Sequence, residues 1–463
     1  MDERDNEFME LVEKFERTVK NNTPAFFDSE ELEEIIEHYF TIFKMDMVKI
    51  AMDRALEQYP YSAIFKIFKA QYLSGLHETT EALAILNELE LIEPSNSEIY
   101  TTRALIYSQM GLSEQAVENY KIALKHSDDP AEIYIAIGQE FLNEEKANDA
   151  IYYFKKALKF KQDSDFLLNE LALSFDLADK NEEAIVFFEK YIDESPYSFY
   201  AWFNYGVCLS KKQQFEKAIE AYDYCIAIKE DFSSAYFNKG NALANLTRYD
   251  EAIAVYQETF AYEDPDPSAY FYIGECYENL ENFDKALLNY NKAIKLDPSF
   301  GDAWLAIGIV LDAQNRLTEG IHYIKKAIEL NALNPEYWYV FAEVQNKLGF
   351  QDEAINAFIK VIELGYDDFD IYLDYSNVLI ENGYELEAIS VLEQGLKMFP
   401  DAAELHYRMS AQLMLLGKKQ ESLVYLQNAL VLDYEKHNEL FDYVPEMKDN
   451  AAVLQVINTY KKH

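Results

Sequence analysis

Alanine recurs along this chain every 34 residues, and this period limits the possible folds more than any other feature. Nine alanines share the register: Ala82, Ala116, Ala150, Ala184, Ala218, Ala252, Ala286, Ala354 and Ala388. A period of this length, made of two halves with helical spacing, is typical of stacked helix-turn-helix units. The sequence therefore predicts an all-α solenoid, in which each unit packs against its neighbours.

Two further columns keep the same register. If the alanine is place 20, the repeats begin at residues 29, 63, 97, 131, 165, 199, 233, 267, 301, 335, 369 and 403. Place 24 is large and apolar, as in Tyr120, Phe154, Phe188, Tyr222, Tyr256, Tyr290 and Phe358. Place 8 is small, as in Ala104, Gly138, Ala172, Gly206, Gly240, Gly274 and Gly308. Small residues at facing places let two helices approach closely.

The segment Ala201-Trp-Phe-Asn-Tyr-Gly, followed by Phe215-Glu-Lys-Ala-Ile-Glu-Ala-Tyr, resembles the tetratricopeptide repeat (TPR) family in both halves of its pattern. The resemblance covers residues 29–436. It implies a right-handed α-solenoid of about twelve helix pairs, the two helices of a pair being formed by the first and second halves of a repeat. Residues 1–28 and 437–463 are expected to form capping helices at the two ends.

The amino-terminal cap shows two local signals. Phe8, Leu11, Val12, Phe15 and Val19 form one stripe of an amphipathic helix. Asp28 and Glu31 are spaced as a capping box for the helix that follows. At the other end, Val453, Leu454, Ile457 and Tyr460 follow Pro445 with the spacing of a closing helix.

The charge of the chain limits its partners. The formal net charge is −42, from 83 acidic and 41 basic residues, which argues against a nucleic-acid partner because phosphate binding depends on Lys and Arg. The first residues lack an apolar run of the kind found in a secretory signal, and no long apolar segment suggests membrane insertion. We expect a cytoplasmic protein. The predominance of lysine over arginine suggests a bacterial source.

No arrangement of residues predicts catalysis, a cofactor or a metal site. The histidines and the three cysteines never pair at metal-ligand spacing, and the chain has neither a phosphate-binding glycine loop nor a nucleophile elbow. Cys208, Cys225 and Cys276 occupy small-residue places and are expected to be buried thiols. Because the repeats occupy nearly the whole chain, a separate catalytic domain has no room.

The TPR resemblance implies a concave groove lined by the first helices, with ligands meeting places 2, 5, 6, 9, 12 and 13. Residues at these places are the predicted partner-binding set: Phe203, Asn204, Phe237, Asn238, Asn241, Phe271, Tyr272, Glu275, Glu278, Asp312, Tyr339 and Glu343. Only Lys211, Lys347 and Arg408 are basic at these places. Family members that hold acidic chaperone tails need Lys or Arg at places 5 and 9, so a carboxylate clamp is not expected here.

These observations favour a non-catalytic scaffold or adaptor that binds a basic or neutral polypeptide in its groove. Two alternatives stay open. The chain is a regulatory subunit that docks on an enzyme, membrane complex or ribosome through its convex face, or it binds a polymer or glycan through the aromatic ladder at place 5. The partner and the oligomeric state do not follow from the sequence.

Overall fold

The computed structural model describes residues 3–21, 23–162 and 164–461, and every regular element in these ranges is a helix. The chain forms two compact units, Met1–Asp231 and Phe232–His463. The first unit contains α1 (Glu3–Asn21), α2 (Ser29–Thr41), α3 (Met45–Gln58), α4 (Ala63–Gly75), α5 (Thr79–Ile92), α6 (Ser97–Gln109), α7 (Ser113–Ala123), α8 (Ala131–Asn143), α9 (Ala147–Leu158), α10 (Asp165–Leu177), α11 (Asn181–Glu194), α12 (Phe199–Lys211) and α13 (Phe215–Ile228).

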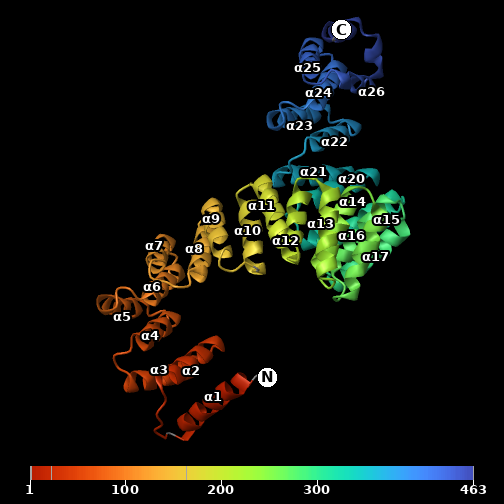
Figure 1. The fold of residues 1–463 in the computed structure, drawn as a ribbon. Helices are drawn as coiled ribbons and strands as arrows, with labels where there is room; N and C mark the ends of the chain where they lie inside the picture. Colours follow the sequence, from red (N-terminus) through yellow and green to blue (C-terminus); the bar gives the residue numbers. More distant parts are fainter. Residues whose placement is uncertain (1–2, 22, 163, 462–463) are drawn as a thin grey trace. The chain divides into compact units, whose positions relative to one another are not determined.

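The second unit continues the same alternation. It contains α14 (Ser233–Asn245), α15 (Tyr249–Glu258), η1 (Thr259–Ala261), α16 (Pro267–Asn279), α17 (Phe283–Leu296), α18 (Gly301–Ala313), α19 (Leu317–Leu330), α20 (Pro335–Lys347), α21 (Gln351–Leu364), α22 (Asp370–Glu381), α23 (Glu385–Met398), α24 (Ala403–Leu415), α25 (Lys419–Leu432), η2 (Glu435–Asn438), α26 (Glu439–Tyr443), η3 (Pro445–Asp449) and α27 (Ala451–Tyr460). Figure 1 shows this helical succession from red to blue along the chain.

The predicted all-α architecture of stacked helix pairs is confirmed. From α2 to α25, even-numbered helices are the first helices of the pairs and odd-numbered helices are the second ones. A second helix packs on the first helix of its own pair and, within a unit, on the next first helix along the chain. No helix among the described residues is long and apolar enough to cross a membrane.

The small and large columns of the repeat meet inside each pair. A Cβ added to Gly206 would lie 2.5 Å from the ring of Tyr222, and one added to Gly274 would lie 2.5 Å from the ring of Tyr290. The rings of Phe154 and Tyr256 approach Gly138 and Gly240 in the same way. Place 8 is therefore small because the side chain at place 24 of the same repeat covers it.

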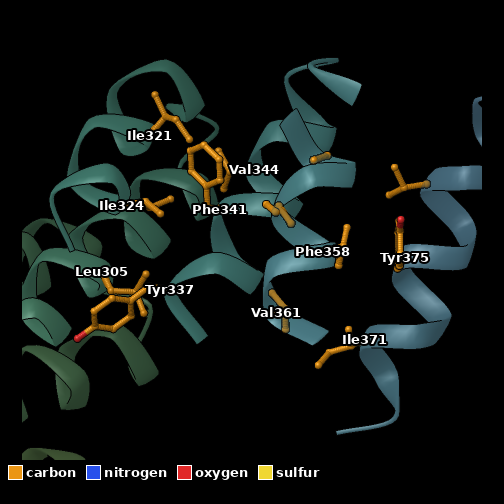
Figure 2. Packing of buried hydrophobic residues seen from close by; sticks show 14 of the residues in the cluster. Leu305, Ile321, Ile324, Tyr337, Phe341, Val344, Phe358, Val361, Ile371 and Tyr375 are labelled. Atoms are coloured by element: carbon orange, nitrogen blue, oxygen red, sulfur yellow. The ribbon is translucent and has the colours of Figure 1, made fainter. Parts of the chain in front are cut away.

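One buried cluster of the second unit continues through several successive helices, from Leu305 of α18 to Ala388 of α23. Figure 2 shows part of it, where Ile324, Phe341 and Phe358 come from successive helices and pack with Tyr375 of the following pair. Phe358 and Tyr375 stack with ring centroids 5.4 Å apart. Each pair thus completes the apolar surface of the one before it.

The amino-terminal helix α1 packs on α2, as the apolar stripe predicts. Val12 and Phe15 are buried, and Phe8, Leu11 and Val19 pack partly buried around them. The predicted capping box is confirmed, because Asp28 accepts a hydrogen bond from the Glu31 backbone and Glu31 accepts one from the Asp28 backbone. Residues 1–2 and 22 of the predicted cap lie outside the described residues.

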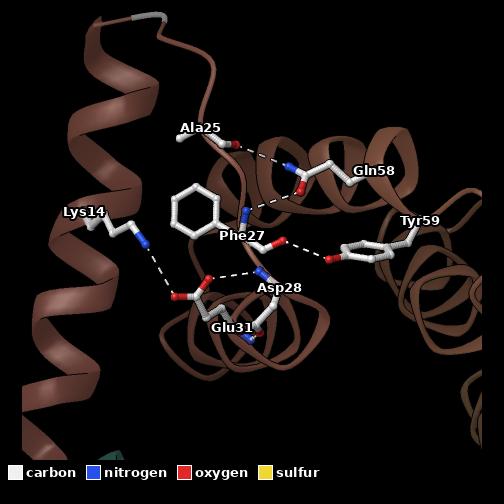
Figure 3. Close-up of polar contacts among 7 residues, drawn as sticks. All are labelled: Lys14, Ala25, Phe27, Asp28, Glu31, Gln58 and Tyr59. Carbon is white, nitrogen blue, oxygen red and sulfur yellow. Dashed lines mark hydrogen bonds and ion pairs between the residues drawn. The ribbon is translucent and has the colours of Figure 1, made fainter.

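The connection between α1 and α2 is fastened to α3 and its end (Figure 3). Gln58 donates a hydrogen bond to the Ala25 carbonyl at 3.4 Å and accepts one from the Phe27 N–H at 3.3 Å. The Tyr59 hydroxyl donates to the Phe27 carbonyl at 3.1 Å. These bonds satisfy backbone groups of a segment that has no helical partners of its own.

The carboxyl-terminal segment closes the last pair. Pro445 begins the short helix η3, and α27 follows with Val453 and Ile457 buried against the last pair. Leu454, which the spacing placed on the same face, is 37% exposed. Residues 462–463 of this predicted cap lie outside the described residues.

Candidate functional site

We call the surface formed by places 5, 6, 9, 12 and 13 of the even-numbered helices the first-helix face. In the second unit it is built by α14, α16, α18, α20, α22 and α24, and it carries ten of the twelve predicted binding residues.

The aromatic residues of the face pack mainly on one another. The rings of Phe237 and Tyr272 meet edge to face with centroids 5.4 Å apart, and Tyr256 stacks on Tyr272 at 6.1 Å. Phe271 packs on Tyr290 at 5.6 Å and on Phe300 at 5.1 Å. Phe237, Phe271 and Tyr272 are all only partly buried. The ladder therefore packs helices within and between pairs, and its rings keep part of their surface exposed.

The two predicted asparagines of α14 form hydrogen bonds with different partners. Asn241 accepts a hydrogen bond from the Tyr256 hydroxyl at 2.6 Å, whereas Asn238 donates to the Ser234 carbonyl of its own helix at 2.9 Å. Beside Asn241 opens a pocket of about 420 Å³. Its lining is polar and aromatic, and comes from Asn241, Ala244, Asn245, Tyr249, Tyr256, Tyr272, Glu275, Cys276 and Asn279.

Two glutamates of α16 are partly buried here. Glu275 lines the pocket, and Glu278 lies next to it. Burial, together with the nearby charges of Glu278 and Asp302, raises the pKa of Glu275 to about 7. Burial also raises the pKa of Glu278, although the hydrogen bond that Glu278 accepts from Tyr290 at 2.6 Å opposes the shift. Burial disfavours the charged form of both carboxylates, and repulsion by like charges adds to this at Glu275, which is therefore readily protonated near neutral pH.

Further along the face, α20 brings Tyr339 and Glu343 beside carboxylates of its neighbours. The Tyr339 hydroxyl donates to Asp374 at 2.5 Å. Burial raises the pKa of Glu343; Lys347 opposes this shift, and the charges of Asp374 and Asp312 add to it. Lys347 lies 2.5 Å from Asp312, the predicted residue of α18. The one basic residue among these places of α16, α18 and α20 is therefore already engaged by a carboxylate.

The first unit presents the other two predicted residues differently. Asn204 is only 5% exposed and donates a hydrogen bond to Asn169 at 3.0 Å. The ring of Phe203 packs on Tyr222 with centroids 6.1 Å apart. Both residues serve packing between neighbouring helices, and Asn204 has little surface for a ligand. As binding residues they stay predictions.

Successive first helices are linked by polar contacts at a separation of 35 residues, which the sequence reasoning missed. Such contacts join Ser74 to Gln109, Asn169 to Asn204, Asp176 to Lys211, Asp302 to Tyr337, Asp312 to Lys347, and Tyr339 to Asp374. A separation of 35 residues joins one place of a repeat to the following place in the next repeat. The signal was present in the sequence as complementary side chains one place out of register, and it would have identified Asp302 and Asp374 as partners of Tyr337 and Tyr339.

No cluster of side chains in the described ranges has the composition of a metal site. The three cysteines are buried as expected, and burial raises the pKa of Cys208 to about 11 and those of Cys225 and Cys276 to about 12. Their thiols are thus poor nucleophiles, since the reactive form is the thiolate. Arg408, a basic residue at a predicted groove place, is 2% exposed and lies over the Tyr443 ring.

Comparison with solved structures returns other repeat proteins at low identity. Yeast Tom70 is 16% identical over 93% of this chain and 95% of its own, with a TM-score of 0.45. The Cut9–Hcn1 hetero-tetramer of the APC/C is 14% identical over 94% and 90%, with a TM-score of 0.39. YrrB, described as a TPR protein with an unusual peptide-binding site, is 20% identical over 40% and 95%, with a TM-score of 0.32. No curated protein sequence matches significantly.

Three family models, each described as tetratricopeptide repeat, match the sequence. One matches residues 267–300, a second residues 187–220, and a third residues 97–125, 233–259 and 301–332. These segments lie in both units. Those that begin at residues 97, 233, 267 and 301 start where a repeat of the alanine period starts, whereas the match over residues 187–220 begins within the second helix of a repeat. Segments in both halves of the chain thus match tetratricopeptide repeat models, which is consistent with a protein built of many such repeats.

Proposed function

We propose that this protein is a non-catalytic scaffold that binds a polypeptide segment on the first-helix face of its second unit, over residues 267–368. The TPR fold commonly mediates interactions between proteins, and this face carries several partly buried carboxylates. The observation that carries the proposal is the partly buried carboxylate set Glu275, Glu278 and Glu343, opposed among the groove places of these repeats by Lys347 alone.

The chemistry of this face favours a basic or neutral segment with apolar residues at intervals. A cationic side chain placed beside Glu275 would relieve the repulsion from Glu278 and Asp302 that raises its pKa. The pocket beside Asn241 and the edges of Phe271 and Tyr339 offer room and apolar contact area. Opposite charges should speed the encounter and exclude acidic segments, so binding should weaken as salt is added.

The proposal is tested with labelled synthetic peptides in which lysine and leucine alternate, compared with glutamate and leucine peptides of equal length. We expect wild type to bind the lysine series and to lose affinity in Glu275→Gln with Glu343→Gln. Glu278 is left intact, because it accepts the hydroxyl of buried Tyr290 and its loss would perturb packing. Fluorescence anisotropy at two salt concentrations gives the affinities.

The matched control is Glu353→Gln with Glu393→Gln, which removes the same charge from exposed positions on the second helices α21 and α23. If the control weakens binding as much as the test variant does, the attraction comes from the net charge of the chain rather than from this face. Unchanged binding in the test variant would move the binding surface elsewhere.

A further inference from the structure

The strongest basic segment of this acidic chain lies at the end of a second helix in the first unit. Residues 155–161 read Lys-Lys-Ala-Leu-Lys-Phe-Lys, with four lysines and no acid, in a chain with twice as many acidic as basic residues. The segment begins in the last turn of α9 and continues into the turn after it. Lysines in the last turn of a helix are stabilised by its dipole. The dipole accounts for the position of these lysines in the helix, but not for the pocket beside them.

A pocket of about 360 Å³ opens beside this segment, between the ends of α9 and α11. Helix α9 ends at Leu158, place 28 of its repeat, whereas α11 continues to Glu194, place 30 of the next. The early end of α9 leaves the surface of α11 uncovered. The pocket is lined by Lys155, Leu158, Lys159, Gln162, Phe187, Lys190, Tyr191, Glu194 and Ser195.

Two lysines of the pocket form no ion pair with a carboxylate of the described residues. The Lys155 ammonium lies 4.7 Å from the ring centroid of Phe175 and 5.0 Å from that of Phe187. Burial lowers the pKa of Lys155, and the nearby charge of Glu183 opposes this shift. Among the residues that the structure describes, no carboxylate oxygen lies within 4.0 Å of the ammonium of Lys155 or Lys159. In a chain so rich in acids, a partly buried ammonium without a carboxylate partner is unusual.

The other lysines of the neighbourhood are engaged. Lys156 lies over the rings of Tyr134 and Tyr152, and Lys161 pairs with Glu132. Lys190 lies 3.7 Å from Glu194, at the opposite wall of the pocket. Positive charge therefore converges on the pocket from α9 and α11, and it is partly offset by Glu194, which pairs with Lys190, and by Glu183 near Lys155.

We infer that this pocket docks an acidic segment of a partner protein, with one apolar side chain inserted between Leu158, Phe187 and Tyr191 and flanking carboxylates on Lys155 and Lys159. Apolar walls favour a peptide side chain over a free inorganic anion. Lysine acts as a point charge, without the paired geometry with which arginine grips phosphate. The pocket lies on second helices, so this inference is independent of the proposed function of the first-helix face.

The test uses a fluorescein-labelled peptide of about twelve residues, with one central phenylalanine flanked by glutamates, and its glutamine counterpart. Wild type should bind the glutamate peptide more tightly than the glutamine one. Lys155→Met with Lys159→Gln and Lys190→Gln should weaken binding of the glutamate peptide by about tenfold or more, as expected for the loss of several charge pairs. Lys325→Gln with Lys326→Gln and Lys360→Gln, on the second helices α19 and α21, removes the same number of charges; this matched control should bind like wild type.

Thermal melting by circular dichroism checks that the variants fold, and Lys159→Gln alone, at an exposed position, serves if the triple variant does not. Four results would overturn the inference. They are equal affinity for the two peptides, unchanged binding in the lysine variant, full displacement of the peptide by inorganic phosphate, and self-association of the wild type that the lysine variant loses. The last would show that a second copy occupies the pocket.

Discussion

The first-helix faces of the two units rest on the same repeat interior but balance their charges differently. In the first unit, Asn204 bonds to Asn169 and Lys211 pairs with Asp176, so polar groups on neighbouring helices satisfy one another. In the second unit, Glu275 lies among like charges and its pKa is raised to about 7. The interior places of the repeat keep the same residue types in both units, whereas the exposed places of its first helix differ from one repeat to the next.

The shared interior can be tested by overpacking one alanine in each unit. Ala218 and Ala252 are both fully buried at place 20. We expect Ala218→Leu and Ala252→Leu each to lower the free energy of unfolding by about 1–3 kcal/mol, because added methyl groups force a packed helix pair apart. Urea unfolding followed by circular dichroism measures this. If one variant unfolded like the parent, the two units would not share the same interior register.

Two tyrosines at place 24, one in each unit, have hydroxyl partners of different charge. Tyr222 of the first unit meets a neutral group, and Tyr290 of the second unit meets a carboxylate. The hydroxyl of Tyr222 lies 3.2 Å from that of Ser210, whereas Tyr290 donates to Glu278 at 2.6 Å. At pH 8, Tyr222→Phe should cost about 1 kcal/mol and Tyr290→Phe about 1.5–3 kcal/mol, since a bond to a charged group contributes more. In both variants the phenylalanine ring keeps the packing of the tyrosine ring on the glycine at place 8, Gly206 or Gly274.

The difference between the two phenylalanine variants should shrink in acid. Glu278 has a raised pKa, so it takes up a proton before ordinary glutamates do as the pH falls, and the charged acceptor is lost. Thermal unfolding of both variants and the parent at pH 8 and pH 5 measures the difference. Equal costs at pH 8 would mean that the Tyr290–Glu278 bond contributes no more than a neutral one.

The sequence predicted the interior of this protein well because interior places repeat. Alanine at place 20, glycine at place 8 and the ring at place 24 each recur, and the contact of Gly274 with Tyr290 is what their spacing implied. The capping box of Asp28 and Glu31 followed from a local rule about two residues three apart. Such features depend on periodicity or on neighbours in the chain.

The contacts of the face were less predictable because they join residues of different repeats. Nothing local to Asn204 shows that Asn169 satisfies it, nor that Tyr339 donates to Asp374. Helix α9 ends early, at Leu158, and the pocket lined by Lys155 and Lys159 opens there. Where α9 ends depends on how Leu158 and the turn after it pack against α11. Period-based reasoning treats every repeat as equal and cannot find what distinguishes one from the next.

The raised pKa of Glu275 predicts that the stability of the second unit depends on pH. The first unit should lack this contribution at the corresponding position, which is Val207. The folded pKa of Glu275, about 7, lies above its ordinary value of 4.5. The folded state therefore holds the proton more tightly, and this group destabilises the protein as the pH rises from about 4.5 to 7. Glu275→Gln should flatten the loss of melting temperature over that interval. Parallel pH profiles for variant and parent would show that Glu275 is not perturbed.

The smallest effect on stability, and the clearest separation of fold from binding, comes from two equivalent lysines. Lys211 and Lys347 both stand at place 13 and pair with an aspartate at place 12 of the preceding repeat, Asp176 and Asp312. These ion pairs are partly exposed, so Lys211→Gln and Lys347→Gln should each change the free energy of unfolding by no more than about 0.5 kcal/mol. Binding of the lysine and leucine peptides should respond unequally, because only Lys347→Gln frees a carboxylate beside Glu343. We expect that variant to bind them more tightly, and Lys211→Gln to bind them like wild type. Equal tightening in both variants, measured by the same anisotropy titration, would mean that the peptide senses the charge of the whole chain and that the faces of the two units do not differ in function.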